Sequence, residues 1–175
     1  MTASTVDLKE HIRDIPDFPK KGIIFKDITP LLGSPQAFAA VVDRIAAHYA
    51  AAGIKKVAGI EARGFLFAGA VAKQLGAGVI PIRKKGKLPY RTLAAEYALE
   101  YGTDSVEIHE DAATAGEPVL LIDDVIATGG TAAASCELLE KTGAKIAGVC
   151  FIIELGFLKG REKLAGREIF SLLEY

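Results

Sequence analysis

The chain has 175 residues, of which 50% are hydrophobic and 25% are charged. This length favours one domain over residues 1–175, and the composition excludes disordered, collagenous and coiled-coil chains. Lysine and arginine total 21 against 22 for aspartate and glutamate, so the net charge is −1 and no basic field favours nucleic acid or an anionic membrane. Any anion-binding site must therefore be local.

The cysteine content and the chain ends indicate a cytoplasmic protein. Cys136 and Cys150 have no CxxC spacing and are too few for a structural zinc site, so reduced thiols are expected. The N-terminal residues contain no apolar core of signal-peptide length, and no run of about 18 apolar residues occurs. We expect a soluble protein without membrane or nucleic-acid partners.

The first third of the chain is predicted to contain a short helix, an extended flap and a long helix. The charged segment 8–15 is predicted to be helical, and prolines and a glycine then break it into an extended loop, so that residues 1–33 form a flap. Ser34 followed by Pro35 is typical of a helix start. Apolar residues at helical spacing continue towards Gly53: Phe38, Val41, Val42, Ile45 and Tyr49.

From residue 56 the pattern alternates between strands and helices. Helices are expected at 64–75 and 131–142. Continuous apolar strands between helices predict an α/β fold, with a mainly parallel central sheet and helices on both faces. The polar connection 84–102 is long for a compact domain, which is typical of a lid. The expected strands are 56–60, 78–83, 118–124, 145–155 and 168–173.

The strongest motif directly follows the apolar strand 118–124. Folds with a parallel sheet bind ligands just beyond the carboxyl ends of their strands. Two glycines there allow several N–H groups to converge on one anion, two threonines add hydroxyl donors, and the next helix contributes its positive end. The motif predicts a phosphate-binding loop. Neither a Walker A loop nor a GxGxxG fingerprint is present, which disfavours ATPase and Rossmann alternatives. The loop residues are Ala127, Thr128, Gly129, Gly130 and Thr131.

Asp123 and Asp124 directly precede this loop. Adjacent carboxylates repel each other and a bound phosphate unless a cation or a hydroxyl lies between them. Ribose hydroxyls and hydrated Mg²⁺ meet that need, and Mg²⁺ commonly keeps its waters beside few carboxylates. We expect no direct protein ligand to the metal, with both acids contacting it through water. Alternatively, one acid caps a helix and the other is solvated.

The strand, the acid pair and the loop together resemble the signature of the type I phosphoribosyltransferase family, which binds phosphoribosyl pyrophosphate (PRPP). The resemblance covers residues 14–175 and implies that family's fold. It also implies transfer of the phosphoribosyl group from PRPP to N9 of adenine, giving AMP and pyrophosphate in purine salvage, with Mg²⁺ and as a homodimer. Five segments resemble the adenine phosphoribosyltransferase branch: FPKKGIIFKDITPLL, EARGFLFAGAVA, RKKGKLP, ALEYG and ELGFLKGREKL.

The resemblance implies two segments for the pyrophosphate. One is the loop containing Glu61, Ala62 and Arg63, where the family has a cis peptide, here between Glu61 and Ala62. In the other, Lys87 is expected on the pyrophosphate and Arg83 is expected to reach it from the neighbouring subunit of a dimer. Sequence alone also allows Arg63 in a surface ion pair and the basic segment as a solvated turn.

The resemblance also implies the catalytic and adenine-binding residues. Glu100 would take or relay the proton of adenine N9 and stabilise the sugar cation, and Tyr101 would cover the leaving group. A closed site would keep water from that cation. Alternatively, Glu100 is an exposed strand residue.

Adenine recognition is expected in the flap. Backbone groups of Ile24 and Lys26 would read the base edge, and the Ile24 carbonyl would accept from the exocyclic amine, which favours adenine over 6-oxopurines. Phe25 would stack on the ring and Leu155 would close the opposite face, although both could be core residues. Lys26 stands where relatives often have arginine.

Two rival functions remain on sequence grounds. A phosphoribosyltransferase for xanthine or hypoxanthine is disfavoured by the carbonyl expected at Ile24. A PRPP-sensing regulator that binds nucleic acid is disfavoured by the near-zero net charge and by the lack of a helix-turn-helix pattern or basic stripe.

Overall fold

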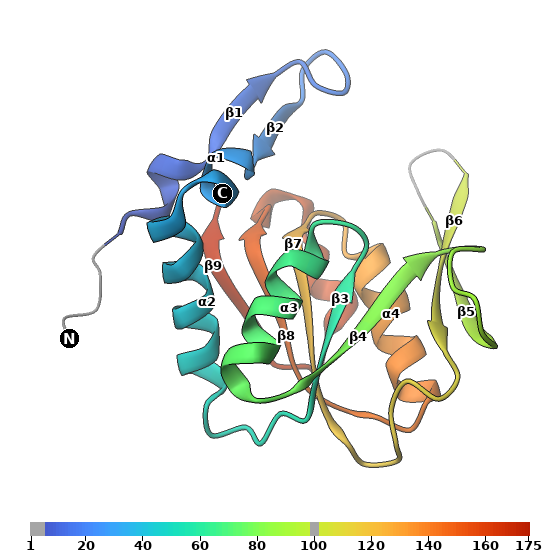
Figure 1. Cartoon of the computed structure of the whole chain (residues 1–175). Helices are drawn as coiled ribbons and strands as arrows, with labels where there is room; N and C mark the ends of the chain where they lie inside the picture. The colour runs from blue at the N-terminus through green and yellow to red at the C-terminus, as the bar shows by residue number, and fades with distance from the viewer. Residues whose placement is uncertain (1–5, 99–101) are drawn as a thin grey trace. The chain divides into compact units, whose positions relative to one another are not determined.

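The structure, a computed structural model, describes residues 6–98 and 102–175 (Figure 1). The chain divides into two compact units, Met1–Arg44 and Ile45–Tyr175. The first unit contains a two-stranded sheet and the second a seven-stranded sheet. The expectation of one domain stays a prediction.

The first unit differs from the predicted helix over 8–15. A 3-10 turn, η1 (Leu8–His11), is capped by the Asp7 carboxylate, which accepts from the Lys9 N–H at 2.9 Å. Beyond it the helix prediction is wrong, because β1 (Arg13–Pro16) pairs antiparallel with β2 (Ile24–Asp27).

Opposite charges across this hairpin favour the strand over a helix. Arg13 bonds to Asp27 and Lys26 bonds to Asp14, each with nitrogen and oxygen 2.7 Å apart. Cross-strand ion pairs of this kind stabilise strand pairing, whereas Pro16 could not continue a helix. The pairing depends on residues more than ten positions apart, so the local pattern did not reveal it.

Two helices follow. The short helix α1 (Thr29–Gly33) was not predicted; the Asp27 carboxylate accepts from the Thr29 N–H at 2.9 Å. Helix α2 (Pro35–Tyr49) begins as predicted, with the Ser34 hydroxyl accepting from the N–H two residues after Pro35 at 3.2 Å. It ends at Tyr49, before the predicted end near Gly53.

The seven-stranded sheet has the order β5-β6-β4-β3-β7-β8-β9. Strands β4, β3, β7, β8 and β9 run parallel, and β6 is antiparallel to both β4 and β5. This confirms a mainly parallel sheet. The strands are β3 (Lys56–Ile60), β4 (Gly78–Lys84), β5 (Thr92–Ala98), β6 (Thr103–His109), β7 (Pro118–Ile126), β8 (Lys145–Glu154) and β9 (Ile169–Glu174).

Helices α3 (Gly64–Leu75) and α4 (Gly130–Lys141) cover opposite faces of this sheet (Figure 1). Successive residues of a strand point to opposite faces. In β3, a Cβ on Gly59 would lie 2.7 Å from the Cβ of Ala68 in α3. Its neighbour Ala58 belongs instead to the buried cluster that includes Leu138 of α4. The prediction of helices on both faces is therefore confirmed.

The segment 84–102, expected as a polar lid, contains the regular strand β5. Leu93, Ala95 and Tyr97 alternate along it and pack on the core cluster that includes residues of α4. This period-two pattern gives β5 a buried face and explains its pairing with β6. The lid function stays a prediction.

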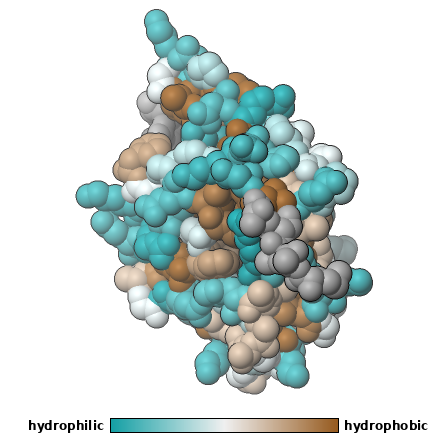
Figure 2. Space-filling view, turned by 90° about the vertical axis from the view of Figure 1, so that its left-hand side faces the viewer, coloured by the Kyte–Doolittle hydropathy of each residue, from teal (hydrophilic) through white to brown (hydrophobic). Residues whose placement is uncertain are grey.

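The remaining features of the second unit concern its C-terminal part and its surface. Two 3-10 turns, η2 (Gly156–Leu158) and η3 (Gly160–Leu164), connect β8 to β9. Cys136 and Cys150 are free and buried. Hydrophilic residues cover most of the face in Figure 2. Within the described ranges no helix is both long and apolar enough to cross a membrane.

Candidate active site

The carboxyl end of β7 brings together an acid pair and an arginine from another segment. The Asp124 carboxylate is buried, with 5% of the residue exposed, and accepts from Arg63 Nε at 2.5 Å. Arg63 directly precedes α3. Asp123 Oδ1 accepts from the Asp124 N–H at 2.9 Å. The ion pair joins two motifs that lie 61 positions apart in the chain.

Asp123 is the electrostatically costly member of the pair. Burial and then the negative charge of Asp124 raise the pKa of Asp123 well above the usual aspartate range. The start of α3 presses closely on this side chain, because a Cβ on Gly64 would lie 3.0 Å from Asp123 Oδ1. A hydroxyl donor or a cation at this position would relieve the charge.

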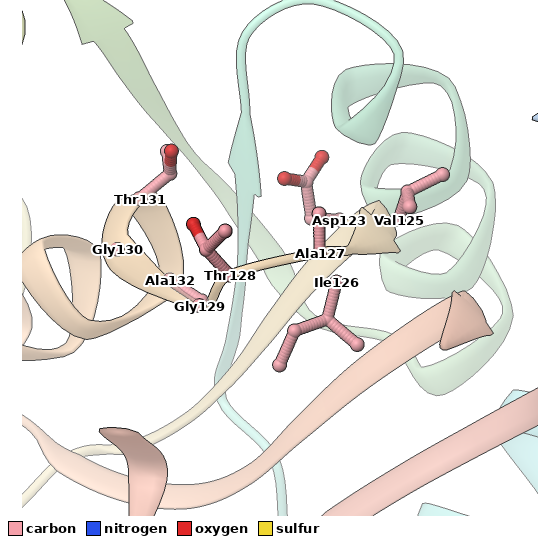
Figure 3. A pocket seen from close by; sticks show the side chains of 9 residues that line it. All are labelled: Asp123, Val125, Ile126, Ala127, Thr128, Gly129, Gly130, Thr131 and Ala132. Carbon is pink, nitrogen blue, oxygen red and sulfur yellow. The ribbon is translucent and has the colours of Figure 1, made fainter. Parts of the chain in front are cut away.

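The loop after β7 combines a glycine turn with the start of a helix, and its binding of an anion stays a prediction. Gly129 has a φ of +78°, which favours glycine, and α4 starts at the next residue. A cavity of about 90 Å³ is lined by Asp123 and residues 125–132. Figure 3 shows the Asp123 carboxylate and the hydroxyls of Thr128 and Thr131 on the same side of the chain, with Ile126 on the other. These donors and the helix end can surround a phosphate group.

The loop after β3 places Glu61 among the basic residues of the segment after β4. Glu61 accepts from Lys87 Nζ at 2.8 Å, from the Lys84 N–H at 3.0 Å and from Arg83 Nε at 3.3 Å. Lys87 first, then the Lys84 N–H and Arg83, lower the pKa of Glu61 to about 2. The peptide between Glu61 and Ala62 is cis, as the resemblance implied. Two cations expected at a pyrophosphate thus share one carboxylate.

Glu107, which is not among the predicted site residues, helps to hold the same basic segment. Glu107 is 8% exposed, and its carboxylate accepts from the Gly86 N–H at 3.0 Å. It lies opposite Arg83 in the β4–β6 pairing. A carboxylate between the buried Val106 and Ile108 was a usable signal, since buried charges require partners.

The residues expected at adenine fall in different units of the chain. Ile24, Phe25 and Lys26 lie in β2 of the first unit, and Leu155 follows β8 in the second. Ile24 is 57% exposed. Phe25 meets Phe18 edge to face, with ring centroids 5.4 Å apart. Their joint contact with a base stays a prediction.

Two further expectations concern the catalytic pair and the metal. Glu100 and Tyr101 lie outside the described residues. Across residues 6–98 and 102–175, no group of three or more His, Cys, Asp or Glu side chains is placed to hold a metal ion. The expected contact of Asp123 and Asp124 with a hydrated Mg²⁺ ion through water stays a prediction.

The fold and the loop after β7 define a phosphoribosyl transferase domain, and that family model matches residues 32–168. An adenine phosphoribosyltransferase of Acidothermus cellulolyticus is 58% identical over 163 residues, covering 93% of this chain and 92% of the relative. The chain belongs to the adenine phosphoribosyltransferase family.

Solved structures agree with this membership. The crystal structure of adenine phosphoribosyltransferase from Thermoanaerobacter pseudethanolicus has a TM-score of 0.93 and 50% identity, covering 96% of this chain and 98% of that chain. The Saccharomyces cerevisiae enzyme, complexed with an imino-altritol bisphosphate and adenine, has a TM-score of 0.91 and 42% identity, covering 95% and 96%. The similarity extends over nearly the whole of each chain.

Proposed function

We propose that this chain transfers the 5-phosphoribosyl group of PRPP to N9 of adenine, releasing AMP and pyrophosphate. The observation that carries the proposal is the cavity at residues 125–132, directly beside the Asp123–Asp124 pair and Arg63. This arrangement, together with 58% identity to an adenine phosphoribosyltransferase, supports the proposal.

The proposed substrate position follows from charge. The 5′-phosphate of PRPP would occupy loop 127–131, where backbone N–H groups and the hydroxyls of Thr128 and Thr131 would donate to it. The ribose hydroxyls would donate to Asp123 and Asp124. The pyrophosphate would then lie towards the cis-peptide loop and Arg63, with Lys87 and Arg83 turned from Glu61 to the ligand.

Mg²⁺ fits this arrangement as a hydrated ion. Burial and the negative charge of Asp124 raise the pKa of Asp123, and a cation nearby would favour its carboxylate form. Asp123 and Asp124 would hold the ion through its waters, together with oxygens of PRPP. When bound, Mg²⁺ would supply neutralisation of pyrophosphate charge.

Catalysis would come from orientation and electrostatics. Holding both substrates in line removes much of the entropic barrier, and Arg63 would stabilise the departing pyrophosphate. Glu100 would accept or relay the N9 proton, and Tyr101 would cover the leaving group; both roles are inferred from the family resemblance. Exclusion of water would protect the sugar cation from hydrolysis.

Adenine specificity would arise in β2. Ile24 lies opposite Pro16 in the hairpin, and a proline has no N–H to donate to the Ile24 carbonyl. The exocyclic amine of adenine would be the donor, whereas a 6-oxo group would oppose one acceptor with another. Phe25 and Leu155 would cover the two ring faces, and Lys26 would contact the base through its backbone.

A cytoplasmic homodimer is proposed on the family resemblance alone. In it, Arg83 would reach the pyrophosphate of the neighbouring subunit. Within the single chain, Arg83 donates to Glu61 and, through NH1, to the Lys87 carbonyl at 3.0 Å. The trans contact would require Arg83 to leave these partners.

The proposal is tested by turnover of the purified chain with PRPP, Mg²⁺ and one of four bases: adenine, hypoxanthine, guanine or orotate. Adenine should give the highest kcat/KM, with AMP and pyrophosphate formed in equal amounts. Faster turnover with another base would overturn the base assignment, and no turnover with any base would overturn the enzymatic role.

A further inference from the structure

The 3-10 turn η3, between β8 and β9 in the chain, is in contact with the proposed phosphate loop after β7. A Cβ on Gly160, the first residue of η3, would collide with the Ala127 carbonyl oxygen and would lie 2.9 Å from the Gly129 nitrogen. Conversely, a Cβ on Gly129 would collide with the Gly160 carbonyl oxygen. The two backbones are therefore in direct contact, with no room for a methyl group on either.

The Gly160 turn is anchored by a buried carboxylate. Arg161 donates to Glu154 with both arms of its guanidinium, Nε to Oε1 at 2.9 Å and NH2 to Oε2 at 2.5 Å. Glu154 is 6% exposed and also accepts from the Ser171 hydroxyl at 2.6 Å. Paired geometry of this kind fixes orientation as well as distance.

The anchor is connected to the strand that carries the loop. Glu154 lies opposite Ile126 in the β7–β8 pairing, and the Leu155 N–H donates to the Ile126 carbonyl at 3.0 Å. At the other end of the turn, Leu164 is fully buried in the core cluster. The turn is thus held at both ends while Gly160 presses on the residue after Ile126.

We propose that Gly160 is a positioning residue for PRPP: its bare backbone, fixed by the Arg161–Glu154 pair, sets the shape of loop 127–131 and so its affinity for a 5′-phosphate. This role rests on the proposed function of that loop. In this proposal Gly160 itself contacts no substrate. If the Ala127 carbonyl is displaced, the N–H groups of loop 127–131 no longer point to one position. The decrease in affinity should therefore be specific to the 5′-phosphate.

The test compares Gly160→Ala with Gly69→Ala, a matched control in α3 where an added Cβ meets nothing within 4 Å. Titration calorimetry measures ribose 5-phosphate and pyrophosphate separately, and steady-state assays give KM for PRPP and for adenine. In Gly160→Ala, ribose 5-phosphate affinity should fall and KM for PRPP should rise by about tenfold or more. Pyrophosphate affinity and KM for adenine should stay within about twofold of wild type, because Gly160 is proposed to act only through loop 127–131. The control should change none of these.

A second variant keeps the test decisive if Gly160→Ala fails to fold. Arg161→Lys keeps the charge but loses the two-armed contact with Glu154, so it should weaken ribose 5-phosphate more than pyrophosphate, by a smaller factor. Equal weakening of the two ligands, or unchanged ribose 5-phosphate affinity in a folded variant, would overturn the role of Gly160. Absence of AMP formation by the wild type would instead overturn the proposed function.

Discussion

Glu61 is the residue on which the basic segment after β4 converges. It is acidic, it lies beside an expected polyanion site, and its bonds to Lys87 and Arg83 compensate cations that would otherwise repel each other. Its side chain is 12% exposed, so these bonds are only partly screened by solvent. Glu61 thus holds both cations at one carboxylate, near the place where we propose that pyrophosphate binds.

Glu61→Gln should make the free energy of unfolding less dependent on pH. The pKa of Glu61 is about 2 in the folded chain, below the ordinary 4.5, so its charge stabilises the fold above pH 4.5 and this contribution is lost as pH falls towards 2. Urea unfolding at pH 7 and at pH 3 should show wild type and variant converging in free energy of unfolding at the lower pH. The exposed Glu96 supplies the control, Glu96→Gln. An equal difference between wild type and Glu61→Gln at both pH values would contradict the prediction.

At the scale of elements, the β5–β6 hairpin joins the phosphate loop to the basic segment. Tyr97 of β5 packs near the start of α4, since a Cβ on Gly130 would lie 3.5 Å from its ring. Its hydroxyl donates to Asp104 of β6 at 3.1 Å, and Lys84 bonds to the same carboxylate. Asp104 and Lys84 thus connect the hairpin to the end of β4.

Tyr97→Phe isolates the hydroxyl of this network because the ring is kept. The variant should lose about 1 kcal/mol of unfolding free energy, the usual worth of a hydrogen bond to a partly buried partner. Chemical denaturation measures the loss, and in an Asp104→Asn background the same substitution should cost clearly less. Tyr90→Phe, at a tyrosine that is 55% exposed, should stay within about 0.5 kcal/mol. Equal costs of Tyr97→Phe in the two backgrounds would exclude the coupling.

Elements with a continuous apolar pattern could be predicted from sequence, and those that depend on pairing could not. Strand β3 and helix α3 have the predicted bounds. A buried strand and an amphipathic helix each show a characteristic hydrophobic pattern in the local sequence. Strand β1 could not be predicted because its stability comes from ion pairs with the neighbouring strand β2. The alternation in β5 was present but was read as polar connection.

At the scale of the molecule, the order of motifs along the sequence predicted the family and the phosphate loop. The contacts between those motifs could be identified only from the folded structure. Asp124 and Arg63 were both chosen as site residues, yet their ion pair spans 61 positions. The contact between Gly129 and Gly160 left no signal except two glycines, since steric exclusion is a property of neighbours in space.

In the proposed homodimer, each site could use Arg83 of its own subunit or Arg83 of the neighbouring subunit. If Arg83 acts across the proposed dimer, a site needs Asp124 from one subunit and Arg83 from the other. Arg83→Ala and Asp124→Asn should each be nearly inactive alone. Co-expressed with different tags, they should recover about a quarter of wild-type activity, because half of randomly formed dimers are mixed and each mixed dimer keeps one intact site.

Activity would recover because both defects of a mixed dimer fall in the same site, which leaves the other site intact. In a mixed dimer, the subunit with Asp124→Asn donates its intact Arg83 to the partner's intact acid pair, and the other site carries both losses. Light scattering must show a dimer, and the measurement is the activity of the whole co-expressed mixture; the doubly tagged dimers, once isolated, should show about half of wild-type activity. If Arg83 instead serves its own chain, as its bonds to Glu61 and to the Lys87 carbonyl within one chain allow, every site in the mixed dimer keeps one defect and no activity returns.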